Sequence, residues 1–109
     1  MTTAKIKGFN GKYLISDTGE VLMAYRNNAQ NEIVTYNPPI IRKAQLNACG
    51  YLTVQLLLPD KRHKLCGVHR LVAEYFIPNP KNYKYVGHKN GNKLDNSKDN
   101  LFWTNKKFT

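Results

Sequence analysis

The sequence predicts an α+β fold that is built from small β-hairpins and one helix. Apolar residues alternate with a period of two in residues 50–58 and recur at helical spacing in residues 68–76. Short runs rich in Gly, Asn, Asp and Pro separate these segments, as expected for turns. A chain of 109 residues can bury one core, so we expect a single folding unit with two parts, residues 1–48 and 49–109.

In the first part, residues 12–23 indicate a β-hairpin. Two short apolar runs flank an Asp-Thr-Gly turn, whose Gly19 can adopt the positive φ that a tight turn often needs. Residues 26–39, by contrast, are polar and end in two consecutive prolines. We expect a loop or an extended connector there and not a packed element.

A second hairpin begins the second part. Four alternating apolar side chains define one face of its first strand: Leu52, Val54, Leu56 and Leu58. Residues 59–62 (Pro-Asp-Lys-Arg) favour a turn, and residues 64–68 return as the partner strand.

Residues 68–76 predict a helix with one apolar face. Its apolar positions follow the spacing i, i+3, i+4, i+7 and i+8: Val68, Leu71, Val72, Tyr75 and Phe76. Pro78 and Pro80 cannot continue the helix. Two short strand candidates follow, residues 83–89 and 101–105, and the loop between them is rich in Asn, Asp and Gly.

The composition favours a polyanionic partner. Lys and Arg total 17 against 7 Asp and Glu, which gives a net charge of +10, and most of the excess lies after residue 40. Nucleic acid is the first expectation, whereas a neutral metabolite is disfavoured. A ribosomal-type protein or a merely solubilising basic surface remains the alternative on charge alone.

The cysteines and the lengths of the apolar runs indicate the cellular compartment of the protein. Cys49 and Cys66 have no CxxC partner, so we expect neither a structural zinc nor a disulfide framework, and we expect both thiols to be reduced and partly buried. No apolar stretch has the length of a signal peptide or a membrane span. We therefore expect a cytoplasmic protein with no membrane partner.

His88 is the candidate for chemistry. It ends a predicted strand and faces the Asn-rich loop, where an oxygen can hold one ring nitrogen while the other accepts a proton. From these residues alone, a structural histidine beside a glycine-containing loop remains the more common alternative.

The motifs VHRLVAEYFIPNP (68–80) and VGHKNGNKLDNSKDNLFW (86–103) change this balance. Together they closely resemble the HNH homing endonucleases of phage genomes and mobile introns. Upstream, KGFNGKYLISDTGEVLM (7–23) resembles the small nuclease-associated module that commonly precedes them. The resemblance covers nearly the whole chain and implies a phage- or mobile-element-encoded protein that acts on DNA in the host cell.

The resemblance also implies a ββα-metal site around one divalent cation, usually Mg²⁺, with Mn²⁺ as the alternative. His88 aligns with the general base that deprotonates the attacking water. Asn100 aligns with the middle Asn of the HNH name, which braces the loop and orients the histidine. We expect the other polar loop residues to cap backbone groups and to do no chemistry: Asn90, Gly91, Asn92, Asp95 and Asn96.

Two positions depart from the family pattern. A metal-binding Asp or Asn often precedes the base, and here that residue is Gly87. The other protein ligand lies on a final helix, at a position that corresponds to Thr109. We therefore expect a partial ββα-metal region that lacks its last helix and has unassigned metal ligands. Either the site is weakened or inactive, or the chain is a truncated form.

Binding to DNA requires basic side chains but not a complete metal site. The residues that we expect to contact DNA are basic or imidazole side chains around the second hairpin, the helix and the loop: Arg42, Lys43, Lys61, Arg62, Lys64, His69, Arg70, Lys89 and Lys93. For His69, a capping or packing role is an equal alternative.

The sequence thus predicts a DNA-binding protein of the HNH type that nicks DNA by metal-dependent phosphodiester hydrolysis. The alternative is a cleavage-incompetent HNH relative that acts by binding DNA or a host or phage protein, as a regulator or inhibitor would. A basic RNA- or ribosome-associated protein is the third reading.

Overall fold

Three small antiparallel sheets and one helix make up the computed structural model, which describes residues 2–106. The first sheet has the order β1-β2-β3-β4: β1 (Thr3–Lys5), β2 (Tyr13–Ser16), β3 (Val21–Asn27) and β4 (Ile33–Arg42). The second contains β5 (Gln45–Leu46), β6 (Leu52–Leu57) and β7 (His63–Gly67), and the third pairs β8 (Tyr85–His88) with β9 (Leu101–Thr104). The helix α1 spans Val68–Phe76, and a 3-10 turn, η1, spans Lys98–Asn100. The predicted α+β class is confirmed.

The first predicted hairpin is present as β2 and β3. Ile15 pairs with Val21, and Gly19 in the connecting turn has φ +93°. Both strands place apolar side chains in the core, where Ile15 and Val21 are fully or almost fully buried. The hairpin therefore supplies both a tight turn and part of the core.

The expectation of a loop or connector over residues 26–39 is wrong for most of that segment. β4 pairs antiparallel with β3 through residues 33–35 and 40–42, and the register shifts between these two stretches, at Met23 and Tyr25 of β3. Because β4 is the last strand of its sheet, its prolines do not interrupt a ladder on the outer side. Polar composition was misleading here, since an edge strand with little burial does not need an apolar face.

The second hairpin and the helix match their predicted segments. Val54 and Leu56 of β6 are buried while Gln55 between them is exposed, and Val54 pairs with Cys66 of β7. In α1 the buried positions are Val68, Leu71, Val72 and Ala73. The short strands β1 and β5 were not predicted from the sequence.

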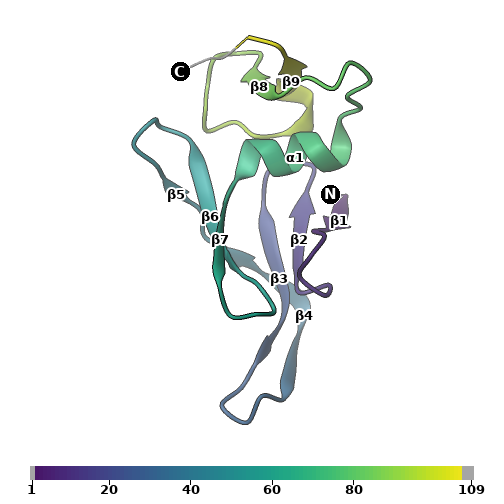
Figure 1. The fold of residues 1–109 in the computed structure, drawn as a ribbon, viewed down its shortest axis with the longest axis vertical. Helices are drawn as coiled ribbons and strands as arrows, with labels where there is room; N and C mark the ends of the chain where they lie inside the picture. Colours follow the sequence, from purple (N-terminus) through teal and green to yellow (C-terminus); the bar gives the residue numbers. More distant parts are fainter. Residues whose placement is uncertain (1, 107–109) are drawn as a thin grey trace.

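The buried core takes side chains from both predicted parts of the chain. Ile15, Leu56 and Val72 are each fully buried, and the same cluster includes Val86 of β8 and Leu101 of β9. In Figure 1, α1 lies across the molecule with β8 and β9 on one side and the longer strands on the other. The strand that ends in His88 is thus anchored to the core through Val86.

Two further expectations concern the cysteines and the membrane. Cys66 is partly buried, and burial raises the pKa of its thiol, but Cys49 is exposed, contrary to expectation. Cys49 lies in the turn between β5 and β6, where its side chain is not needed for the core. Within residues 2–106, no helix has the length and apolar character that crossing a membrane requires.

Candidate active site and nucleic-acid interface

His88 stands at the end of β8, and its ring is hydrogen-bonded to the loop that follows. The ring Nε2 lies 2.8 Å from Oδ1 of Asn96, a residue whose side chain is only 4% exposed. An amide oxygen accepts but does not donate, so Nε2 carries the ring proton in this bond. The other nitrogen, Nδ1, is then the one that can accept a proton.

Asn100 holds the same loop from its other end. Its Nδ2 donates to Oδ1 of Asn90 and to the carbonyl oxygen of Asp95, each at 2.9 Å. Its Oδ1 accepts from the backbone N–H of Asn90 at 3.2 Å, and its carbonyl oxygen accepts from the N–H of Lys89 at 2.7 Å. These bonds fit the bracing role expected of Asn100, whereas the bond to the His88 ring comes from Asn96.

Asn96 is therefore a site residue to which the sequence analysis gave only a turn-forming role. Its bond to His88 joins residues eight positions apart, and no spacing rule for helices or strands brings these two positions together. Asn90 and Asn92 do behave as expected, because each accepts a nearby backbone N–H within the loop.

Two aromatic rings, those of Tyr51 and His69, lie beside the candidate base. The Tyr51 and His69 rings stack at 4.8 Å between centroids, and the His69 and His88 centroids lie 5.6 Å apart. Burial, followed by the positive charges of His88 and Arg70, lowers the pKa of His69 to about 4. His69 is thus neutral near pH 7, so its expected contact with DNA could not be that of a cation.

A cavity of about 310 Å³ opens in front of His88. Lys89 and Lys93 share its lining with Gly87, Tyr51 and Phe102. The Nζ of Lys93 donates to the carbonyl oxygen of Cys49 at 2.9 Å and lies 4.7 Å from the centre of the Tyr51 ring. A histidine and two cations at one opening form a chemically suitable place for a phosphate.

Gly87 lies beside the aromatic ring of Phe102 from the paired strand. A Cβ at residue 87 would lie 2.5 Å from Cζ and 2.8 Å from Cε1 of that ring, which is too close for any side chain without a shift. The ring thus occupies the place that a metal-binding side chain at this position would need.

One of the two expected metal-ligand positions is Gly87, which carries no side chain. No group of three or more His, Cys, Asp and Glu side chains among residues 2–106 could hold a metal ion. Thr109, the other expected position, lies outside the described residues. The part of the chain that the structure describes therefore assigns no metal ligand.

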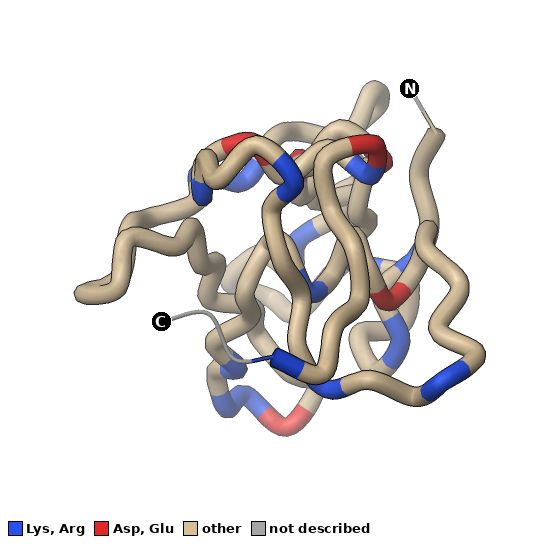
Figure 2. The backbone as a smooth tube through the Cα atoms, turned by 90° about the horizontal axis from the view of Figure 1, so that it is seen from above, with Lys and Arg blue, Asp and Glu red and all other residues tan. Residues whose placement is uncertain are grey.

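The predicted DNA-contacting residues fall into two regions. Lys89 and Lys93 lie at the His88 cavity, and Arg70 lies on α1, where its Nη1 donates to the carbonyl oxygen of Lys84 at 2.7 Å. His69 also lies on α1, and the remaining five lie on or beside the ends of β4 and β7: Arg42, Lys43, Lys61, Arg62 and Lys64. The turn between β6 and β7 is far from β8 and β9 in Figure 1, and Figure 2 shows Lys and Arg spread around the backbone. Arg62 is also paired with Asp60 at 2.7 Å.

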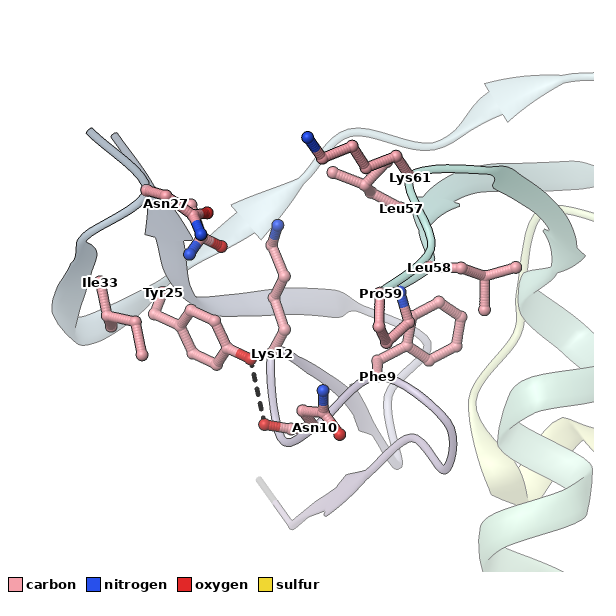
Figure 3. A pocket seen from close by; sticks show the side chains of 11 residues that line it. Phe9, Asn10, Lys12, Tyr25, Asn27, Ile33, Leu57, Leu58, Pro59 and Lys61 are labelled. Atoms are coloured by element: carbon pink, nitrogen blue, oxygen red, sulfur yellow. Dashed lines mark hydrogen bonds between the residues drawn. The ribbon is translucent and has the colours of Figure 1, made fainter. Parts of the chain in front are cut away.

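A separate cavity of about 520 Å³ lies between the β3–β4 hairpin and the turn that joins β6 and β7 (Figure 3). The Tyr25 hydroxyl donates to the carbonyl oxygen of Asn10 across its edge, at 3.1 Å. Its lining includes Lys12 and Lys61 but contains no histidine and no acidic side chain. It therefore lacks a group that could act as a general base at neutral pH, and it is not a candidate for hydrolysis.

Comparison with known proteins identifies the region that contains this site. Residues 66–107 match the family model described as HNH endonuclease. This region belongs to the HNH endonuclease family. The HNH region includes α1, β8, the asparagine-rich loop and β9, and hence both His88 and Asn96.

Relatives of the HNH region also match the strands that precede it. An uncharacterized HNH endonuclease of Acanthamoeba polyphaga mimivirus is 39% identical over 87% of this chain, and a second from the same virus is 38% identical over 90%. The DNA endonuclease I-HmuI of Bacillus phage SP01 is 35% identical over 94%. The chain spans 24%, 22% and 51% of the lengths of these three relatives.

A solved structure supports the same assignment. The HNH homing endonuclease I-HmuI, in a structure described as DNA binding and cleavage by that enzyme, aligns with a TM-score of 0.72 and 32% identity. The alignment covers 95% of this chain and 52% of that one. The fold is thus that of an HNH homing endonuclease, and the N-terminal sheet forms part of the shared structure.

Proposed function

We propose that this chain binds DNA and nicks it by phosphodiester hydrolysis, with His88 as the general base. The observation that carries the proposal is the 2.8 Å bond between His88 Nε2 and Asn96 Oδ1 beside a cavity lined by Lys89 and Lys93. The likeness to I-HmuI, whose solved structure is described as one of DNA binding and cleavage, supports DNA as the substrate.

The chemistry assigned to the chain's own residues begins with a water molecule. Nδ1 of His88 takes a proton from this water, whose oxygen attacks the phosphorus. The bond from phosphorus to the leaving oxygen breaks, and that oxygen takes a proton from solvent. Nε2–H continues to donate to Asn96 after Nδ1 is protonated, so the imidazolium keeps its partner. The ammonium groups of Lys89 and Lys93 would hold the negatively charged phosphate at the opening. One such site cleaves one strand, which gives a nick.

Mg²⁺ or Mn²⁺ is the cofactor that the family resemblance implies. No group of three or more His, Cys, Asp and Glu side chains among residues 2–106 could hold it, so the steps above are assigned to the chain's own residues alone. We propose that nicking requires this metal, and the EDTA arm of the experiment below tests that requirement.

A second candidate function has a specific observation in its favour. The Phe102 ring fills the space beside Gly87, so the position next to the base offers no ligand side chain. A chain of this kind would bind DNA, or a host or phage protein, and act by occupying its target without cutting.

The deciding experiment is nicking of supercoiled plasmid with Mg²⁺ or Mn²⁺, with EDTA as the metal-free arm. We expect His88→Ala to reduce nicking by about 10²- to 10⁴-fold. His63→Ala, which removes an exposed histidine on β7 away from the site, should leave nicking unchanged. Nicking that His88→Ala does not alter would overturn the assignment of the base, and binding without nicking in any metal would favour the second candidate.

A further inference from the structure

We infer that the Asp17–Gly19 turn of the N-terminal hairpin positions His88 for its role, acting through Asn96. This inference rests on the proposed function of His88. Gly19 acts on the ring of His88 only through Asn96, so it is a positioning residue and not a catalytic one.

The first observation is the direct contact between the turn and Asn96. A Cβ at Gly19 would lie 3.0 Å from both the Cβ and the carbonyl oxygen of Asn96, and 3.1 Å from its carbonyl carbon. These distances are shorter than ordinary van der Waals contacts. The turn can approach Asn96 this closely only because residue 19 has no side chain.

The second observation is that the turn is tied to the loop by a hydrogen bond. The backbone N–H of Lys98, two residues after Asn96, donates to the carbonyl oxygen of Asp17 at 2.8 Å. Within the turn, the Ser16 hydroxyl accepts from the N–H of Glu20 at 2.9 Å and lies 3.0 Å from the Thr18 hydroxyl. Ser16 is fully buried, so this turn is a fixed support for the loop.

The third observation concerns the amide of Asn96 itself. Its Nδ2 is buried and has no hydrogen-bond partner among residues 2–106, while its Oδ1 accepts from His88. Hydrogen bonding therefore fixes only one side of this amide. Packing against Gly19 supplies the other restraint, because the contact limits where the Cβ and backbone of Asn96 can lie.

The test compares Gly19→Ala with Gly8→Ala. The two glycines have nearly the same φ, +93° and +91°, but a Cβ at Gly8 would meet nothing within 4 Å. Both variants therefore carry similar backbone strain, and only Gly19→Ala collides with Asn96. If Gly19→Ala does not fold, Gly19→Asn produces the same collision with a residue that tolerates positive φ better.

The measurement is the pair of ring-nitrogen NMR shifts of His88, taken at a pH where the ring is neutral. We expect the wild type and Gly8→Ala to show a protonated Nε2, whereas Gly19→Ala shifts both signals toward a mixture of the two tautomers. Unchanged His88 signals in a folded Gly19→Ala or Gly19→Asn variant would overturn the inference.

A double-mutant cycle separates positioning from loss of stability. In an Asn96→Ala background, Gly19→Ala should still lower stability, but it should no longer change the His88 signals. A change of the same size in both backgrounds would show that Gly19 does not act through Asn96. Because these signals are read without DNA or metal, a wild type that does not nick would contradict the proposed function and leave this result standing.

Discussion

His69 makes the free energy of unfolding depend on pH, and the direction of this dependence follows from the pKa of its ring. Burial lowers the pKa of its ring from the ordinary 6.5 to about 4. Between these values the unfolded chain binds a proton that the native state resists, so the free energy of unfolding falls as the pH drops through this window. Well above pH 6.5 the ring is neutral in both states and contributes nothing to the pH dependence.

We expect the loss between pH 6.5 and pH 4 to be on the order of 2 kcal/mol, because partial exposure of the ring reduces the full value. Denaturant unfolding at a series of pH values measures it. His69→Gln should remove this part of the slope, whereas His63→Gln, at an exposed site, should retain it. Equal slopes in the wild type and His69→Gln would contradict the assignment.

The neighbouring Phe102 ring, and not the backbone angle, restricts which side chain can stand at position 87. Gly87→Ala should lower the free energy of unfolding by about 1–3 kcal/mol, since the new methyl group overlaps the Phe102 ring. Phe102→Leu in the same chain should recover part of the loss by making room. Chemical denaturation of the single and double variants checks this, and an additive result would show that the two positions do not interact.

At the scale of the element, β6 and β7 show how burial and not residue type sets the cost of a substitution. Leu56 on β6 is fully buried, while Leu65 on the neighbouring β7 is 65% exposed. Leu56→Ala should therefore lower the free energy of unfolding by about 2–5 kcal/mol. Leu65→Ala should change it by no more than about 0.5 kcal/mol. Thermal or denaturant unfolding distinguishes the two, and similar losses would contradict the packing described for this sheet.

At the scale of the whole molecule, the net charge of +10 should strengthen the proposed binding to DNA. The affinity should fall linearly with salt on logarithmic axes, with a slope of about −0.9 for each phosphate contact. We expect Lys89→Gln, at the His88 cavity, to make this slope shallower by about 0.9, whereas Lys5→Gln on β1 should leave it unchanged. Titrations at several salt concentrations measure both, and equal slopes for the wild type and Lys89→Gln would remove Lys89 from the interface.

The elements that the sequence predicted well are those whose signal is local. The apolar spacing of residues 68–76 predicted α1 with its observed bounds, because a helix repeats every few residues and its buried face can be counted. Gly19 predicted the turn of the first hairpin, since few residues other than glycine adopt φ +93°. β4 was missed because an exposed edge strand leaves almost no pattern in its side chains.

By itself, the sequence determined the α+β class, the second hairpin, the helix, the place of His88 at a strand end and the resemblance to HNH endonucleases. Only the tertiary structure decided that Asn96 contacts the His88 ring, that Phe102 covers Gly87, and that Gly19 packs against Asn96. The physical reason is distance along the chain. Periodicity and turn preferences act over a few residues. These contacts form only when the loop folds back on His88, when β8 pairs with β9, and when the N-terminal hairpin packs against the loop.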